Sequence, residues 1–155
     1  MKSNFNNKSK CIKMLFSILF VGYLLLLAYL TFFSHYYGRG QLHRSINLIP
    51  FRTIIEFLTS GYNLRIIVTN IAGNIVAFMP MGFLLPIVFN KKNGFRKVVF
   101  VALLSSLTIE VAQYISGVGA SDIDDLILNV LGAMIGYIGY WISRLFNSYK
   151  EMQNT

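Results

Sequence analysis

The sequence predicts an all-α integral membrane protein with four transmembrane helices, both termini cytoplasmic, and a short interfacial or re-entrant helix in the first outer loop. Of its 155 residues, 55% are hydrophobic and only 13% are charged, about half the charged fraction of a typical soluble domain. Four apolar runs approach the ~20 residues that a helix needs to cross a bilayer. The net charge of +8 comes mostly from residues between these runs, which indicates membrane orientation rather than a nucleic-acid partner.

The first apolar run, residues 14–33, contains no charged residue. A basic segment, residues 1–13, precedes it and is expected to lie in the cytoplasm. The run is long for the apolar part of a signal peptide, and no small-residue cleavage site follows it. It therefore predicts an uncleaved membrane anchor.

Three further runs, 66–89, 98–115 and 126–146, complete the predicted membrane domain of residues 14–146. Each carries polar residues that a helix surrounded by lipid would avoid, so these helices are expected to turn polar faces toward one another. Residues 147–155 are predicted to form a cytoplasmic tail.

The distribution of positive charge predicts the orientation. Ten lysines and arginines lie before the first run, in the loop NKKNGFRK and near the C-terminus, whereas four lie in the loop 34–65. Because cytoplasmic segments are enriched in positive charge, both termini should be inside and the acidic stretch SDIDD (121–125) outside.

The outer loop contains the apolar segment INLIPFRTIIEFL, residues 46–58. Pro50 suits the first turn of a helix. At 13 residues the segment is too short to span a bilayer, so it predicts a helix that lies in the interface or re-enters the membrane.

Apart from Arg144 near the inner end of the fourth run, the strongly polar residues of the second, third and fourth runs fall in the outer half of the predicted membrane. At about 1.5 Å per residue, they lie within about 12 Å of the outer helix ends. These residues are Asn70, Asn74, Glu110, Gln113 and Asn129. In α-helical phase, Asn70 shares a face with Asn74, and Asp122 and Asp125 share one with Asn129. We expect these faces to meet in one polar layer.

The acidic stretch SDIDD allows two interpretations. Ser121 at the N-cap with Asp124 three residues later resembles a capping box, which predicts a purely structural role. Asp122 and Asp125 instead continue onto the polar face. Their carboxylates suit acid–base chemistry, a basic group of a substrate, or a hard cation such as a divalent metal. No cofactor is assigned from the sequence.

The predicted site residues fall into two groups. The catalytic candidates are Asp122, Asp125 and Glu110, and the substrate-binding candidates are Asn129, Gln113, Asn74, Asn70, His43 and Arg52. His43 is included as a proton carrier. No residue is assigned as a metal ligand.

The fourth run also carries glycines on the face that bears Asn129. Gly132 and Gly136 form a small-xxx-small pattern, which allows two helices to approach closely. This face predicts either packing within the bundle or an oligomer contact.

Four segments together resemble the VanZ family: NLIPF, GNIVAFMPMGFLLP, IEVAQ and SDIDDLILNVLGAMIGY. The resemblance covers about residues 45–140 and implies a small multi-pass protein of the bacterial cell membrane. It also implies an association with low-level resistance to teicoplanin, a glycopeptide that acts on the cell-wall precursor at the outer face. The resemblance implies no particular reaction, so whether the protein is an enzyme is left open.

These observations support three hypotheses. In the first, an outward-facing carboxylate site binds or modifies a lipid or glycolipid of the cell envelope. In the second, a non-catalytic module shields the lipid-linked precursor or the lipoglycopeptide, or docks a partner protein. In the third, Glu110 couples a proton or cation to transport. Membrane lipids are the expected partners in each case.

Overall fold

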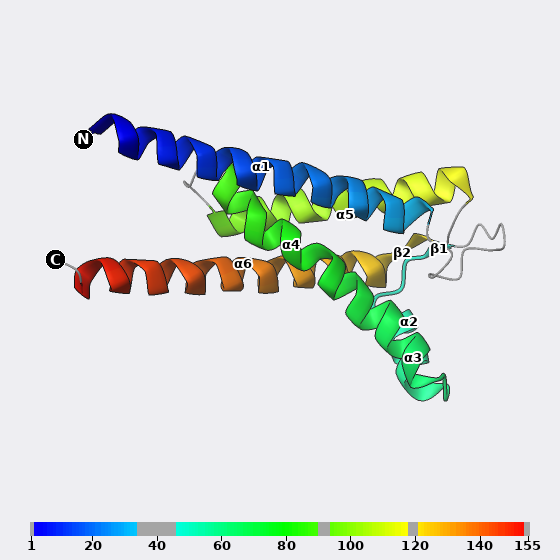
Figure 1. The fold of residues 1–155 in the computed structure, drawn as a ribbon. Coiled ribbons are helices and arrows are strands. Elements are labelled where there is room, and N and C mark those ends of the chain that lie inside the picture. Colours follow the sequence, from blue (N-terminus) through cyan, green and yellow to red (C-terminus); the bar gives the residue numbers. More distant parts are fainter. Residues whose placement is uncertain (1, 34–45, 90–93, 118–120, 154–155) are drawn as a thin grey trace.

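The computed structural model describes residues 2–33, 46–89, 94–117 and 121–153, apart from the side chains of residues 2–9, 147, 150 and 151. Helices make up nearly all of it (Figure 1). The elements, in chain order, are α1 (Lys2–Phe32), β1 (Ile46–Asn47), α2 (Arg52–Thr59), α3 (Leu64–Ile67), the π-helical turn η2 (Val68–Ala72), α4 (Gly73–Val88), α5 (Gly94–Ser116), β2 (Ser121–Asp122) and α6 (Ile123–Gln153).

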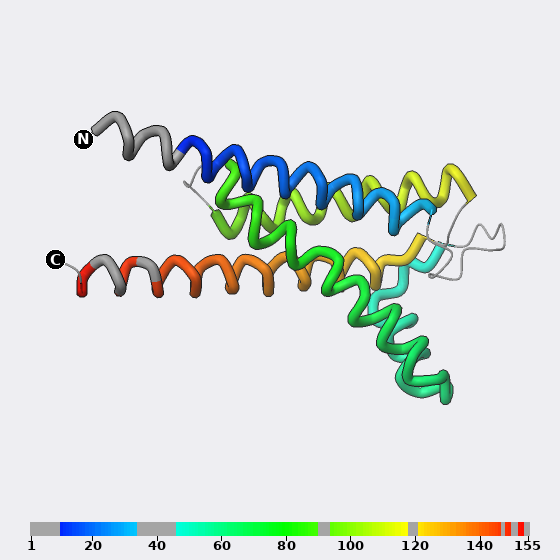
Figure 2. Tube along the Cα trace, in the orientation of Figure 1, coloured from blue at the N-terminus to red at the C-terminus, as the bar shows by residue number. Residues whose placement is uncertain are grey.

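Four helices are long and apolar enough to cross a membrane: 10–32, 64–88, 94–116 and 123–146. The predicted all-helical class with four such helices is therefore confirmed. Large apolar side chains are exposed along all four, as expected where lipid rather than water surrounds a helix bundle. The coloured start of α1 and the coloured end of α6 lie at the same end of the bundle (Figure 2), and the side of the membrane that this end faces stays a prediction.

Helix α4 runs obliquely across the bundle and packs against α1, α5 and α6 (Figure 1). Its contact with α6 is the most extensive and brings the two backbones together. A Cβ atom added to Gly132 or Gly136 would overlap the carbonyl oxygens of Ile75 or Met79. Only residues without a side chain permit this approach.

The same contact corrects one part of the partner prediction. Gly132 and Gly136 are buried against α4 of the same chain, so this face is not open to a second copy or a partner protein. A sequence pattern shows that close approach is permitted, but not which helix makes it.

The span that contains α3, η2 and α4 is irregular. Five residues, Val68–Ala72, form a π-helical turn, and Pro80 and Pro86 lie inside α4. Because proline lacks a backbone N–H, it leaves a carbonyl of the preceding turn without its helical donor. Near this point the Tyr23 hydroxyl of α1 donates to the carbonyl of Ala77 at 2.8 Å, which ties α1 to α4.

The end opposite the termini holds a connection that the sequence did not predict. Residues Ile46 and Asn47 pair in parallel with Ser121 and Asp122. The predicted helix 46–58 is therefore a strand, a turn and a shorter helix, α2, which begins after Pro50 and Phe51. Its place relative to a membrane surface stays a prediction.

Candidate functional site

A polar cavity of about 30 Å³ lies inside the bundle, with lining residues from all four long helices. Its polar lining consists of Thr31, Asn74, Glu110, Gln113, Asp125 and Asn129. Five of these six residues belong to the polar layer predicted from helical depth and phase. The structure thus brings them together, and their roles in binding or catalysis stay predictions.

Two carboxylates line the cavity from different helices. Glu110 of α5 is buried, and its Oε2 accepts the backbone N–H of Asp122 at 2.8 Å. Asp125 of α6 accepts a hydrogen bond from the side-chain amide of Asn74 on α4, at 2.5 Å. These bonds hold both acidic groups at the cavity, where they join α5 to β2 and α4 to α6.

Two side-chain amides complete the polar lining. Gln113 donates to the carbonyl of Thr31 on α1 at 3.4 Å. Asn129 donates through Nδ2 to Ser106 Oγ at 2.9 Å. The Oδ1 of Asn129 is buried and has no hydrogen-bond partner among the described residues, so one acceptor here is unsatisfied.

The cavity therefore offers hydrogen-bond acceptors: two carboxylates and an unpaired amide oxygen. Such a lining favours an occupant that donates hydrogen bonds or carries positive charge. Within the described part of the chain, no three His, Cys, Asp or Glu side chains are grouped as in a typical metal site. The possible ligands for a cation in this cavity are the two carboxylates and the side-chain amide oxygens.

Asp124 was predicted to take part in a capping box at the start of its own helix, but the structure shows it capping a different helix. Its side chain is 1% exposed and reaches the start of α2. The carboxylate accepts the backbone N–H groups of Phe51 at 2.5 Å, Thr53 at 2.8 Å and Ile54 at 3.1 Å. Asp124 therefore caps α2, whose own N-cap residue, Phe51, makes no side-chain cap.

This cap also explains an unusual backbone angle. Phe51 has a φ of 65°, a left-handed conformation that is strained for a bulky residue. Its N–H points to the Asp124 carboxylate. The buried hydrogen bond thus compensates for the strain and fixes the turn that starts α2.

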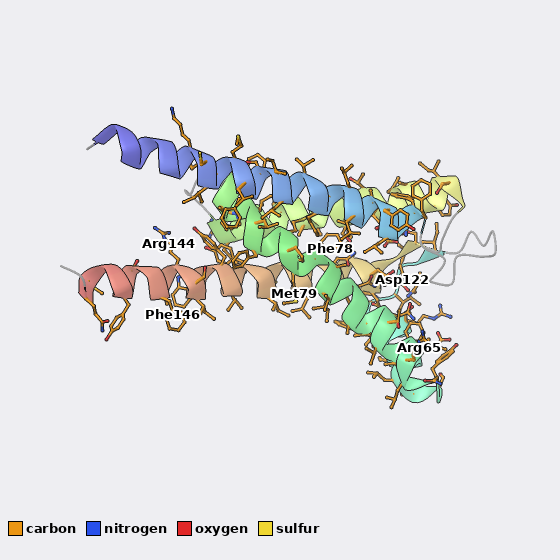
Figure 3. All side chains as sticks on the ribbon, in the orientation of Figure 1. Arg65, Phe78, Met79, Asp122, Arg144 and Phe146 are labelled. Carbon is orange, nitrogen blue, oxygen red and sulfur yellow. The ribbon has the colours of Figure 1, made fainter. Side chains whose placement is uncertain are left out.

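Asp122, a catalytic candidate in the sequence, does not line the cavity. Its Oδ1 accepts the N–H of Asp124 at 2.9 Å, which makes Asp122 rather than Ser121 the residue that caps α6. The same carboxylate accepts from Asn47 Nδ2 at 3.0 Å and from Thr53 Oγ1 at 2.5 Å. Asp122 therefore joins the segment that contains β1 and α2 to the start of α6, at the end of the bundle away from Arg144 (Figure 3).

Two other candidates, Asn70 and Arg52, lie outside the cavity. Asn70 lies in the π-helical turn and donates to the carbonyl of Ile66 at 2.8 Å. A π-turn has more residues per turn than an α-helix, so the α-helical phase that grouped Asn70 with Asn74 does not apply. Arg52 is exposed at the first residue of α2. His43 lies outside the described residues.

An apolar groove of about 320 Å³ adjoins the cavity, and no sequence pattern predicted it. It lies between α1 and α5 with Met81 of α4 at its base. The lining residues are Leu24, Leu27, Ala28, Phe32, Met81, Leu104, Ser105, Thr108 and Ile109. Leu27 and Ile109 also line the polar cavity, so the two spaces are adjacent and share part of their wall.

Comparison with known proteins identifies relatives. A model of the VanZ/LLP1 family matches residues 20–146. Protein VanZ of Enterococcus faecium is 33% identical over 134 residues, which cover 84% of this chain and 76% of the relative. No solved structure matches the chain significantly.

Proposed function

The chain belongs to the VanZ/LLP1 family, and we propose that it binds an envelope lipid or glycolipid in the outer half of the bacterial cell membrane. The lipid chain lies in the groove between α1 and α5, and part of the polar head enters the carboxylate cavity. Binding of this lipid lowers the action of glycopeptides such as teicoplanin at the cell surface.

The observation that carries this proposal is that the polar cavity and the apolar groove are adjacent. A polar pocket beside an apolar channel matches an amphiphile, and Leu27 and Ile109 line both spaces. A water-soluble ligand would bind in the polar cavity without contacting the apolar groove. A polar network with a purely structural role would not require a groove beside it.

The direction of the groove agrees with a lipid of the outer leaflet. On α5 the groove extends from Ile109 toward Leu104, and on α1 its lining residues run from Phe32 to Leu24. In the predicted orientation Leu104 and Leu24 lie nearer the membrane centre than Glu110. The chain of the lipid would thus point inward and its head outward, as in the leaflet itself.

Side access supports the same proposal. Leu24 and Leu104 are partly exposed on the outside of the bundle, so a lipid can enter from the bilayer without unfolding the protein. The cavity is too small for a whole lipid head, and it takes a single small group of that head.

The test is to fill the groove. Ala28 lines it and is small, so Ala28→Trp should exclude part of the lipid chain. Excluding two or three methylene groups at about 0.8 kcal/mol each should weaken lipid retention about tenfold or more. Native mass spectrometry of the full chain in detergent, titrated with defined lipids, measures the retention.

Leu25→Trp is the matched control. Leu25 lies on the same helix, is exposed and is not part of the groove, so this change should leave lipid retention at the wild-type level. Equal retention by the Ala28→Trp and Leu25→Trp proteins would contradict the proposal.

A further inference from the structure

We propose that the cavity selects lipids whose head ends in a primary ammonium group, and that this group is what Glu110, Asp125 and Asn129 bind. The inference rests on the proposed lipid function and names the class of lipid. It follows from the charge, the hydrogen bonding and the size of the cavity.

Charge comes first. Glu110 and Asp125 lie in the cavity wall, and no Lys, Arg or His of the described chain is part of that wall. Each of the two carboxylates already accepts a neutral N–H donor, and a hydrogen bond from a charged donor to a carboxylate is stronger than one from a neutral donor. A cationic head group supplies such donors, whereas a phosphate or carboxylate head would add repulsion.

The unpaired oxygen of Asn129 points to the same chemistry. This residue is 4% exposed, and its amide nitrogen is held by Ser106. Its Oδ1 has no partner among the described residues, and a buried acceptor left without a donor costs about 1–3 kcal/mol. A primary ammonium carries three donors, which suits two carboxylates and one amide oxygen.

Size excludes the nearest alternative cation. The cavity of about 30 Å³ is the space of one or two water molecules. An ammonium group fits such a space. A trimethylammonium group is several times larger, carries no N–H donor, and would leave Asn129 Oδ1 unsatisfied.

The experiment compares two lipids that differ only in methylation of the nitrogen. The full chain in detergent is titrated with phosphatidylethanolamine and with phosphatidylcholine of the same acyl chains, and native mass spectrometry measures retention. Because charge-assisted hydrogen bonds contribute more than neutral ones, we expect wild-type protein to prefer the ethanolamine lipid about tenfold or more.

Two variants test the assigned residues. Asp125→Asn keeps an oxygen that can accept from Asn74 but removes the charge, and Asn129→Leu removes the unpaired oxygen. Each should bring the preference for phosphatidylethanolamine close to parity. Glu56→Gln, which removes an exposed charge on α2, should leave the preference at the wild-type value.

The outcomes separate this inference from the proposed function. Equal retention of the two lipids by wild-type protein, with both weakened by Ala28→Trp, would overturn the ammonium assignment and leave the lipid site standing. Lipid retention that is insensitive to Ala28→Trp would overturn both. Binding of soluble ethylammonium as tightly as of phosphatidylethanolamine would show that the lipid chain contributes nothing and would overturn the aminolipid assignment.

Discussion

The carboxylate of Asp124 accepts the backbone N–H of Thr53 at 2.8 Å across 71 positions of sequence. Through this bond and those from Phe51 and Ile54, the first turn of α6 caps helix α2. The clustered acidic residues therefore have different roles. Asp122 and Asp124 hold the loop to the bundle, whereas Asp125 faces the cavity with Glu110.

The first prediction concerns this cap. Asp124→Asn replaces one acceptor oxygen by an NH2 group that faces backbone N–H groups, so at least one buried donor loses its partner. The expected loss of stability is about 1–3 kcal/mol. Limited trypsin digestion of detergent-purified protein should show faster cleavage after Arg52, because α2 is released from α6.

Glu56→Gln is the control for this experiment. It changes an exposed carboxylate on α2 itself, so cleavage should proceed at the wild-type rate. An Asp124→Asn protein that resists trypsin as well as wild type does would show that the three hydrogen bonds contribute little to holding α2.

The second prediction concerns Thr53. Its hydroxyl donates to Asp122 Oδ2 and lies 3.0 Å from Asn47 Nδ2. Thr53→Val keeps the shape but removes the hydroxyl, which should cost about 1–2 kcal/mol in thermal unfolding. Thr53→Ser keeps the hydroxyl and should therefore retain most of the stability that Thr53→Val loses. If serine were no better than valine, the γ-methyl contact rather than the hydrogen bond would be the stabilising feature.

The third prediction concerns the contact of α4 and α6. An added methyl at Gly132 overlaps the Ile75 carbonyl, so Gly132→Ala should destabilise the bundle by about 1–3 kcal/mol as the backbones separate. At Gly139 an added Cβ would lie 3.7 Å from the Phe83 ring, an ordinary contact. Gly139→Ala should thus be neutral or slightly stabilising, since alanine favours a helix.

Thermal unfolding of the two purified variants in the same detergent makes this comparison. Equal midpoints for Gly132→Ala and Gly139→Ala would contradict the close backbone contact. A changed oligomeric state without a change in stability would instead place Gly132 at an interface between chains.

Helical depth and phase predicted the polar layer correctly where regular α-helical geometry applied. Glu110 and Gln113 lie on one face of an unbroken helix, and Asp125 and Asn129 on another, so depth and phase were enough to place them together. The predicted position of Asn70 was wrong because a π-helical turn changes the helical phase. No residue type reliably predicts such a turn from the sequence.

The contacts of the segment that contains β1 and α2 could not be predicted from the sequence, for a different reason. Capping rules consider neighbours along the chain, so they assigned Asp124 to its own helix. Its actual partners, the amides of Phe51, Thr53 and Ile54, come from a segment about seventy residues earlier. The pairing of β1 with β2 involves two residues on each side, which is too short to leave a periodic pattern.

The fourth prediction joins the cavity to the phenotype. A bacterial host that makes the wild-type chain should be less susceptible to teicoplanin than a host with an empty vector. Asp125→Asn, at equal membrane abundance, should lose most of this protection, since removal of a charged acceptor weakens binding on the order of tenfold or more. Glu56→Gln should protect like wild type. Full protection by Asp125→Asn would mean that the charge in the cavity is not needed, and that Asp125 serves through its hydrogen bond with Asn74, which asparagine can preserve.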